Sequence, residues 1–208
     1  MKLAEIQKEI ETTYQIHCPF SVDEFLLDES ERENFLGRIP WLAHSQEALL
    51  VEQENKDLHV GLLFDSQLLN WSRSQTLKDL ALDHLAQAGP LIEGVSHFVY
   101  LTWRASQERP VTQLELELQG EVDKFILFSR EGSSEQSEKL LQGLFCEVSW
   151  LESLAPEEKH RYETAVKMAS KYCRFLKTRF PRQSEGFFPE IRLFYRMSQA
   201  EKIRHIQA

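Results

Sequence analysis

Cysteine is scarce in this 208-residue chain, which holds only Cys18, Cys146 and Cys173. An odd number of cysteines with no CxxC or CxxH spacing argues against both a disulfide framework and a structural zinc knuckle. We therefore expect three reduced thiols that pack inside the protein.

Long hydrophobic runs are also missing. No stretch approaches the roughly 18 consecutive apolar residues of a membrane-spanning helix, so we expect no membrane span. The N-terminal residues 1–14 mix charged side chains with apolar ones and lack the continuous apolar core of a signal peptide. These two absences predict a soluble, cytoplasmic protein.

Several catalytic and binding motifs do not occur in the sequence. It contains no GxGxxG, GxxxxGK[ST], HExxH or GxSxG pattern, which weakens the case for a nucleotide-binding protein or a serine hydrolase. The net charge of -9 argues against general nucleic-acid binding. The charge is uneven, since residues 150–208 carry 12 Lys and Arg against 7 Asp and Glu. A basic tail of this kind could dock on the acidic remainder of the chain, on a partner or on a second copy.

The length and the 42% apolar content suit one soluble domain with a substantial core. We predict a domain over residues 1–182 and a C-terminal arm over residues 183–208. Two prolines and a glycine mark residues 180–190 as a linker between them. The arm is rich in aromatic residues, which should pack on the domain or, as an alternative, in the groove of a partner.

Helix starts are legible because Ser or Thr followed three residues later by Glu or Gln can cap a helix. Six pairs fit this pattern: Ser21 with Glu24, Ser30 with Glu33, Thr112 with Glu115, Ser133 with Gln136, Ser149 with Glu152, and Ser198 with Glu201. Together with helical periodicity, they predict helices at 2–14, 22–36, 75–88, 90–107, 113–130, 134–146, 155–178 and 199–206. The segments EALLVEQ and LHVGLLF flank the polar ENKD and predict a β-hairpin near residues 47–64.

The predicted fold class is therefore mainly α. We expect a helical bundle around helices 75–88, 90–107, 113–130 and 155–178, with a small β-hairpin packed against it and a C-terminal arm. The Gly89-Pro90 step should turn the chain between the first two of these helices, so that neighbouring helices run antiparallel.

Ionisable side chains close to the apolar faces of these helices are the candidate functional residues. At about 100° per residue, His84 falls in the apolar stripe of helix 75–88, and Glu93 and His97 share a narrow polar strip on helix 90–107. On helix 113–130, Glu121 falls within the apolar arc and Glu117 lies at its edge. Because buried carboxylates and imidazoles are costly unless paired, protonated or bound to metal, their convergence would mark a site.

This residue set predicts a metal centre inside the bundle. Two imidazoles and several carboxylates suit Zn²⁺, Mn²⁺ or Fe²⁺. We predict His84, Glu93, His97 and Glu121 as ligands, with Glu117 as a catalytic base or additional ligand. The spacing Glu93-x-x-x-His97 departs from the Glu-x-x-His motif of di-iron bundles, and no second copy occurs, so a one-metal site is the sharper hypothesis.

The same residues also have a structural interpretation. Glu93 would lie in a first helical turn, where the helix dipole favours a carboxylate, and Glu121 can pair with Lys124 three residues later. Glu115 is interpreted as a cap and left out of the site. The alternative function is then a non-catalytic protein that binds a partner or itself through the C-terminal arm, with the polar cluster as a salt-bridge network.

Overall fold

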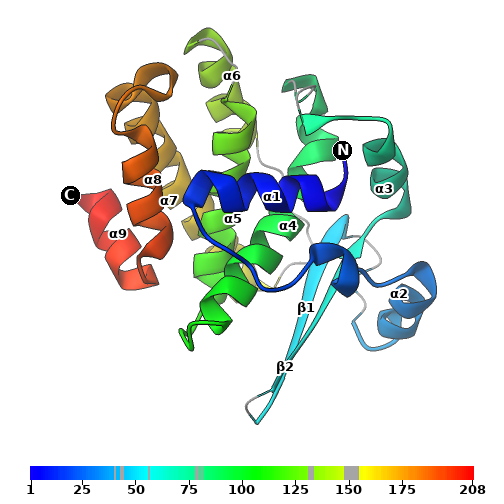
Figure 1. Cartoon of the computed structure of the whole chain (residues 1–208). Coiled ribbons are helices and arrows are strands. Elements are labelled where there is room, and N and C mark those ends of the chain that lie inside the picture. Colours follow the sequence, from blue (N-terminus) through cyan, green and yellow to red (C-terminus); the bar gives the residue numbers. More distant parts are fainter. Residues whose placement is uncertain are drawn as a thin grey trace.

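The computed structural model describes residues 1–39, 41–42, 45–55, 57–77, 80, 82–130, 134–147 and 155–208. The predicted mainly α fold with one β-hairpin is confirmed (Figure 1). The helices are α1 Leu3–Tyr14, α2 Glu29–Leu36, α3 Ser66–Arg73, α4 Leu85–Ala105, α5 Gln113–Phe128, α6 Ser134–Phe145, α7 Pro156–Arg179, α8 Phe187–Arg196 and α9 Gln199–Gln207. The strands are β1 Glu47–Glu54 and β2 Asp57–Phe64, and short 3₁₀ turns are η1 Val22–Phe25, η4 Leu82–His84 and η5 Pro181–Gln183.

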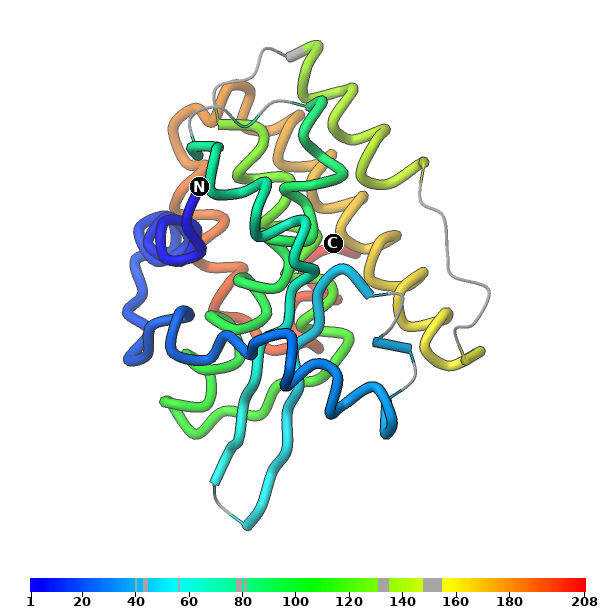
Figure 2. Tube along the Cα trace, turned by 90° about the vertical axis from the view of Figure 1, so that its right-hand side faces the viewer, coloured from blue at the N-terminus to red at the C-terminus, as the bar shows by residue number. Residues whose placement is uncertain are grey.

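The helices α4 and α5 form the centre of the molecule. They pack on each other, α7 covers α5, and α1 crosses α4 (Figures 1 and 2). Both central helices are lined by fully buried apolar side chains, among them Ile92, Phe98 and Val122. Because such a core excludes water from the polar groups between the helices, any charged side chain there needs a partner.

The hairpin meets the bundle at its base and projects away from it at its tip (Figures 1 and 2). Its strands pair antiparallel from Glu47 opposite Phe64 to Glu54 opposite Asp57. Gly94 of α4 allows this contact, because a Cβ there would lie 2.8 Å from the Phe64 ring and 2.9 Å from Oε2 of Glu47. The missing side chain therefore lets the first residue of β1 reach the central helices.

The predicted helix 75–88 and the turn at Gly89-Pro90 are wrong. Gln75, Thr76 and Leu80 are not helical, residues 78, 79 and 81 lie outside the described residues, and α4 runs unbroken through Pro90. Proline inside a helix costs roughly 3 kcal/mol. Leu91 and Ile92, which follow it directly, are fully buried, and this tertiary packing outweighs the local preference for a break.

The predicted helix 22–36 is also wrong as one unit, because it divides into η1 and α2. Between them the chain is extended, and the N–H of Leu27 donates to the carbonyl of Leu62 at 2.9 Å. The cap of α2 is Asp28, which accepts from the N–H of Glu31, and neither Ser21 nor Ser30 caps a helix. Pairing with β2 therefore overrides helical periodicity in this segment.

Of the remaining predicted caps, Thr112 accepts from the N–H of Glu115 at 3.1 Å, and Glu201 accepts from the N–H of Ser198 at 2.8 Å. The predicted cap residues Ser133 and Ser149 lie outside the described residues. The helices α3 and α8 were not predicted, and α8 begins inside the predicted linker 180–190.

The C-terminal arm packs on the bundle through α8 and α9 (Figure 1). Arg192 donates to the carbonyl of Thr13 at 2.9 Å and Arg196 to that of Tyr14 at 3.0 Å, so α8 ties the end of α1. Lys202 of α9 donates to Gln119 of α5 at 2.7 Å. Among the described residues, no helix has the length and apolar character needed to cross a membrane.

Candidate metal centre

Glu93, His97 and Glu117 converge where α4 and α5 run antiparallel. One ligand atom from each residue lies within 4.8 Å of the other two. Nε2 of His97 is 3.8 Å from Oε2 of Glu117, and the His97 residue is only 5% exposed. The structure thus brings together three of the five predicted site residues, with Glu117 as a full member of the group.

Gly120 makes this approach between the two helices possible. A Cβ at that position would lie 2.9 Å from Nε2 of His97 and 3.4 Å from Cγ of Glu93. The first distance is closer than real Cβ contacts, so any larger residue would push the imidazole out of place. The absence of a side chain at Gly120 therefore allows the His97 ring to lie beside the carboxylates.

Glu121 belongs to an adjoining ion-pair cluster around Lys124. The Lys124 ammonium lies 2.7 Å from Oε2 of Glu93 and 3.0 Å from Oε1 of Glu121. The pairing of Glu121 with Lys124 matches the predicted three-residue spacing, whereas the bond from Lys124 to Glu93 links α5 to α4 and could not be read from one helix. Arg161 of α7 closes the other side, with Nε 3.9 Å from Oε1 of Glu117.

Glu47 is a further acidic residue that sequence reasoning missed. It is the first residue of β1, and its Oε2 atom is buried against Gly94 with no hydrogen-bond partner. The carboxylates of Glu93 and Glu117 act on its pKa, which places Glu47 within the same electrostatic cluster. Its position depends on the packing of the hairpin on α4, and a strand residue carries no local signal of such a contact.

Unsatisfied polar atoms concentrate in this cluster. Among the described residues, eight buried side-chain nitrogen or oxygen atoms have no hydrogen-bond partner, and four belong here: Glu47 Oε2, His97 Nε2, Glu121 Oε2 and Arg161 Nε. Buried polar atoms are normally hydrogen-bonded, so each exception calls for an explanation such as a bound ion or water. The atoms of Glu47, His97 and Glu121 are possible ligand atoms that one cation could satisfy, whereas Nε of Arg161 is a donor that faces Glu117.

The protonation equilibria reflect the crowding of carboxylates. Burial raises the pKa of Glu117 to about 8, and Glu93 adds to that shift. Burial, followed by the charges of Glu93 and Glu117, raises the pKa of Glu47 well above its usual range. Burial also opposes the charge of Glu93, but the Lys124 ammonium lowers the pKa of Glu93 overall. Burial likewise raises the pKa of Glu121. The cluster thus holds one carboxylate that ionises readily and three that resist ionisation.

The imidazole of His97 is held in its neutral form. Burial lowers the pKa of His97, and the Lys124 charge acts in the same direction, against the opposing effect of Glu93. A neutral imidazole is the form that binds metal ions. The electrostatics therefore leave His97 a nitrogen lone pair at neutral pH.

His84 does not join this group. It is the N-cap residue of α4, where its ring contacts Trp71 at 5.6 Å between centroids. The distance from His84 to Glu93 is about 13 Å along the helix axis. The prediction placed His84 on a separate helix that would fold back, and because α4 is continuous, that return does not occur.

Glu115 has a different role from the predicted cap. Thr112 does cap α5, but the Glu115 side chain is 2% exposed, accepts from Tyr100 at 2.5 Å and lies 3.6 Å from Arg104. It joins a second buried network on another face of α5. In that network Lys202 donates to Tyr100 at 3.0 Å, and Asp123 accepts hydrogen bonds from Tyr14, Ser96 and Gln119.

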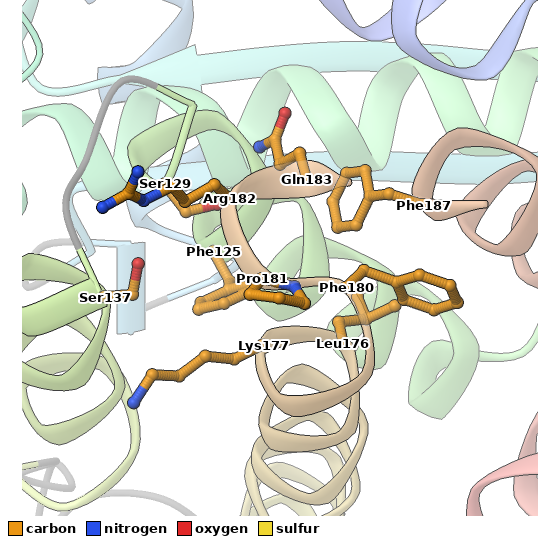
Figure 3. Close-up of a pocket in the computed structure, with 10 residues that line it drawn as sticks. All are labelled: Phe125, Ser129, Ser137, Leu176, Lys177, Phe180, Pro181, Arg182, Gln183 and Phe187. Atoms are coloured by element: carbon orange, nitrogen blue, oxygen red, sulfur yellow. The ribbon is translucent and has the colours of Figure 1, made fainter. Parts of the chain in front are cut away.

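The pocket in Figure 3 shares no lining residue with the metal-centre candidates. It lies between α5, α6, α7 and η5, and its lining includes the rings of Phe125 and Phe180 and the basic side chains of Lys177 and Arg182. Its volume of about 40 Å³ has room for only a few water molecules. Lys177 is paired with Glu138, so its charge is already compensated. We therefore assign no ligand to this pocket.

The chemistry of the cluster follows from its donor set. Two carboxylates and a neutral imidazole, with further carboxylates beside them, suit Zn²⁺, Mn²⁺ or Fe²⁺.

Comparisons of the chain with protein-family models, with curated proteins and with solved structures find no match.

Proposed function

We propose that this protein binds one divalent metal ion, Zn²⁺, Mn²⁺ or Fe²⁺, through Glu93, His97 and Glu117. The observation that carries the proposal is the buried Nε2 atom of His97, which has no hydrogen-bond partner and lies 3.8 Å from Oε2 of Glu117, in a group of three residues whose ligand atoms lie within 4.8 Å of one another. A buried imidazole nitrogen without a partner is costly in a purely structural network. A metal ion coordinated by this nitrogen and the two carboxylates would remove that cost.

The charge of the cluster also favours a divalent ion. Its acidic residues are Glu47, Glu93, Glu117 and Glu121, and its permanent cations are Lys124 and Arg161. With all four carboxylates ionised, the cluster would carry two uncompensated negative charges. One divalent cation would balance them, whereas the metal-free protein must keep protons on the carboxylates whose pKa values are raised.

The same arrangement would suit a metal-dependent enzyme. Three protein ligands leave positions on the ion for water or substrate, as in catalytic rather than closed structural zinc sites. Such an ion would polarise a substrate or acidify a bound water. Under this proposal Glu117 is a ligand, and Glu121 acts through Lys124 to hold Glu93 rather than as a ligand itself.

Metal analysis tests the proposal directly. The protein is purified without chelator or affinity tag, and the metal content of the parent is compared with that of the His97→Ala and Glu117→Gln variants. We expect about one ion per chain in the parent and loss of the ion from both variants. His160→Ala and Glu163→Gln serve as matched controls, because both residues are exposed on α7.

A parent protein that contains no metal, and whose melting temperature is unchanged by added Zn²⁺ or Mn²⁺, would contradict the proposal. Retention of the ion in folded His97→Ala would contradict the ligand assignment.

Binding of a protein partner or of a second copy through residues 183–208 remains the alternative function. Leu193 and Phe188 of α8 are 55% and 36% exposed, and these two apolar side chains are what favours it. A change of oligomeric state in a Leu193→Ser variant would support this alternative.

We also propose a cytoplasmic location, because Cys18, Cys146 and Cys173 are all free thiols, as in a reducing compartment.

A further inference from the structure

Lys124 occupies an unusual place within the carboxylate cluster. Its ammonium group contacts two glutamates from different helices, Glu93 of α4 at 2.7 Å and Glu121 of α5 at 3.0 Å. The Lys124 side chain is only 11% exposed, so the contact is buried rather than a surface ion pair. A buried charge held by two carboxylates in this way has the partners that a bridging metal ion would have.

Glu93 connects this ammonium group with the proposed metal position. One of its oxygens takes part in the group of ligand atoms with His97 and Glu117, and Oε2 accepts from Lys124. In centres with two metal ions, the ions lie roughly 3.5–4 Å apart and act together on one reaction. Glu93 thus stands between two neighbouring cation positions, one of which holds the lysine.

We infer that Lys124 takes the place of a second metal ion and limits this centre to a single metal. This inference rests on the proposed function, because it assumes that Glu93, His97 and Glu117 bind the first ion. Among the described residues, the cluster has four glutamates, from α4, α5 and β1, which are enough carboxylates for two ions, but one histidine, and a single metal ion beside Lys124 would account for this.

Ligands for a second ion are already present around the lysine. Glu121 has a second oxygen, Oε2, that is buried and has no hydrogen-bond partner, and Oε2 of Glu47 is in the same state. With the ammonium removed, Glu93 and Glu121 would be two buried carboxylates without a counter-charge. Such a pair must either take up protons or bind a cation.

The lysine also has a consequence for the metal-free protein. Its ammonium group lies 2.7 Å from Glu93 of α4 and 3.0 Å from Glu121 of α5. It therefore holds α4 and α5 together at this point when no metal is bound. The proposed first site would keep its arrangement between metal-binding events.

The test compares metal stoichiometry in the full chain with Lys124→Met and Lys124→Arg. Each protein is stripped with chelator and titrated with Mn²⁺ by calorimetry, and electron paramagnetic resonance then distinguishes isolated from exchange-coupled ions. We expect one isolated ion in the parent and in Lys124→Arg, which retains a cation. Lys124→Met should bind two ions with a coupled spectrum.

Lys124→Gln serves as a second variant, because its amide can still hydrogen-bond to one carboxylate. Variants that fold only when Mn²⁺ is supplied, at two ions per chain, would support the inference, since the metal would then replace the ammonium.

A folded Lys124→Met or Lys124→Gln variant that still binds one ion would overturn the inference while leaving the first site intact. Failure of both variants to fold with Mn²⁺ present would overturn it as well. Absence of both Mn²⁺ and Zn²⁺ binding in the parent and in all variants would instead contradict the proposed function.

Discussion

Ionisation of Glu117 should destabilise the metal-free protein as the pH rises towards 8. The pKa of Glu117 is raised from 4.5 in the unfolded chain to about 8 in the fold, because the carboxyl group is buried beside Glu93. A raised pKa means that the folded state favours the protonated form. The stability that this proton provides is complete below pH 4.5 and is lost as the pH rises through 8.

The magnitude follows from the size of the shift. One pKa unit corresponds to about 1.36 kcal/mol, so the change from 4.5 to about 8 gives at most about 5 kcal/mol. The side chain is 12% exposed, so solvent screens little of this effect. Glu117→Gln removes the titrating group and keeps a similar shape, and its stability should therefore fall much less with pH.

Urea unfolding at several pH values between 5 and 9, with chelator present, measures the effect. At pH 5 the parent and Glu117→Gln should be of similar stability, and at pH 9 the metal-free variant should be the more stable by several kcal/mol. Added metal should reverse this order at high pH, because it binds the ionised parent and not the amide. Parallel stability curves for the two proteins with chelator present would refute the reasoning.

Three further predictions concern neighbouring positions. Gly120→Ala should weaken metal binding at least tenfold and destabilise the fold by about 1–3 kcal/mol, because the added Cβ would meet the ring of His97. Metal titration and urea unfolding measure these two effects. The control Gly37→Ala should leave metal binding unchanged, because a Cβ at Gly37 would have nothing within 4 Å. Glu47→Gln should lower metal affinity several-fold in a calorimetric titration if its carboxylate contributes to the site, and an unchanged affinity would remove it from the ligand set. Burial lowers the pKa of Lys202 to about 7, so the contribution of Lys202 to stability should grow as the pH rises from 7 towards 10.5, opposing the loss caused by Glu117 up to pH 8. In urea unfolding, the stability of the parent minus that of Lys202→Met should therefore increase over this range, and a constant difference would contradict the reasoning.

Part of the site could be predicted from the sequence because its residues share continuous helices. Glu93 and His97 are four residues apart on a helix that is apolar on most of its surface, and Glu117 follows on the next helix, so periodicity places all three at the right helix faces. Glu47 could not be found in this way. It reaches the cluster only because the hairpin packs where Gly94 has no side chain.

The errors in the predicted fold have the same origin. A Gly-Pro step usually ends a helix, and only the burial of Leu91 and Ile92 shows why α4 continues through Pro90. The error moved His84 onto a separate helix and into the predicted ligand set. The helix α8 was missed because its start is determined by Gly186, with a left-handed φ of 93°, inside a segment that has the composition of a linker.

The position of α5 between two polar networks has a consequence for mutational studies. Every residue of this helix after Gln113 is at least partly buried, and it carries Glu117 and Glu121 towards the metal-centre candidates and Gln119 and Asp123 towards the network of Lys202. A saturation mutagenesis screen that scores only growth or abundance should therefore find almost the whole helix intolerant. Such a screen would not separate ligands from core residues, and a screen of α5 needs metal occupancy as its readout.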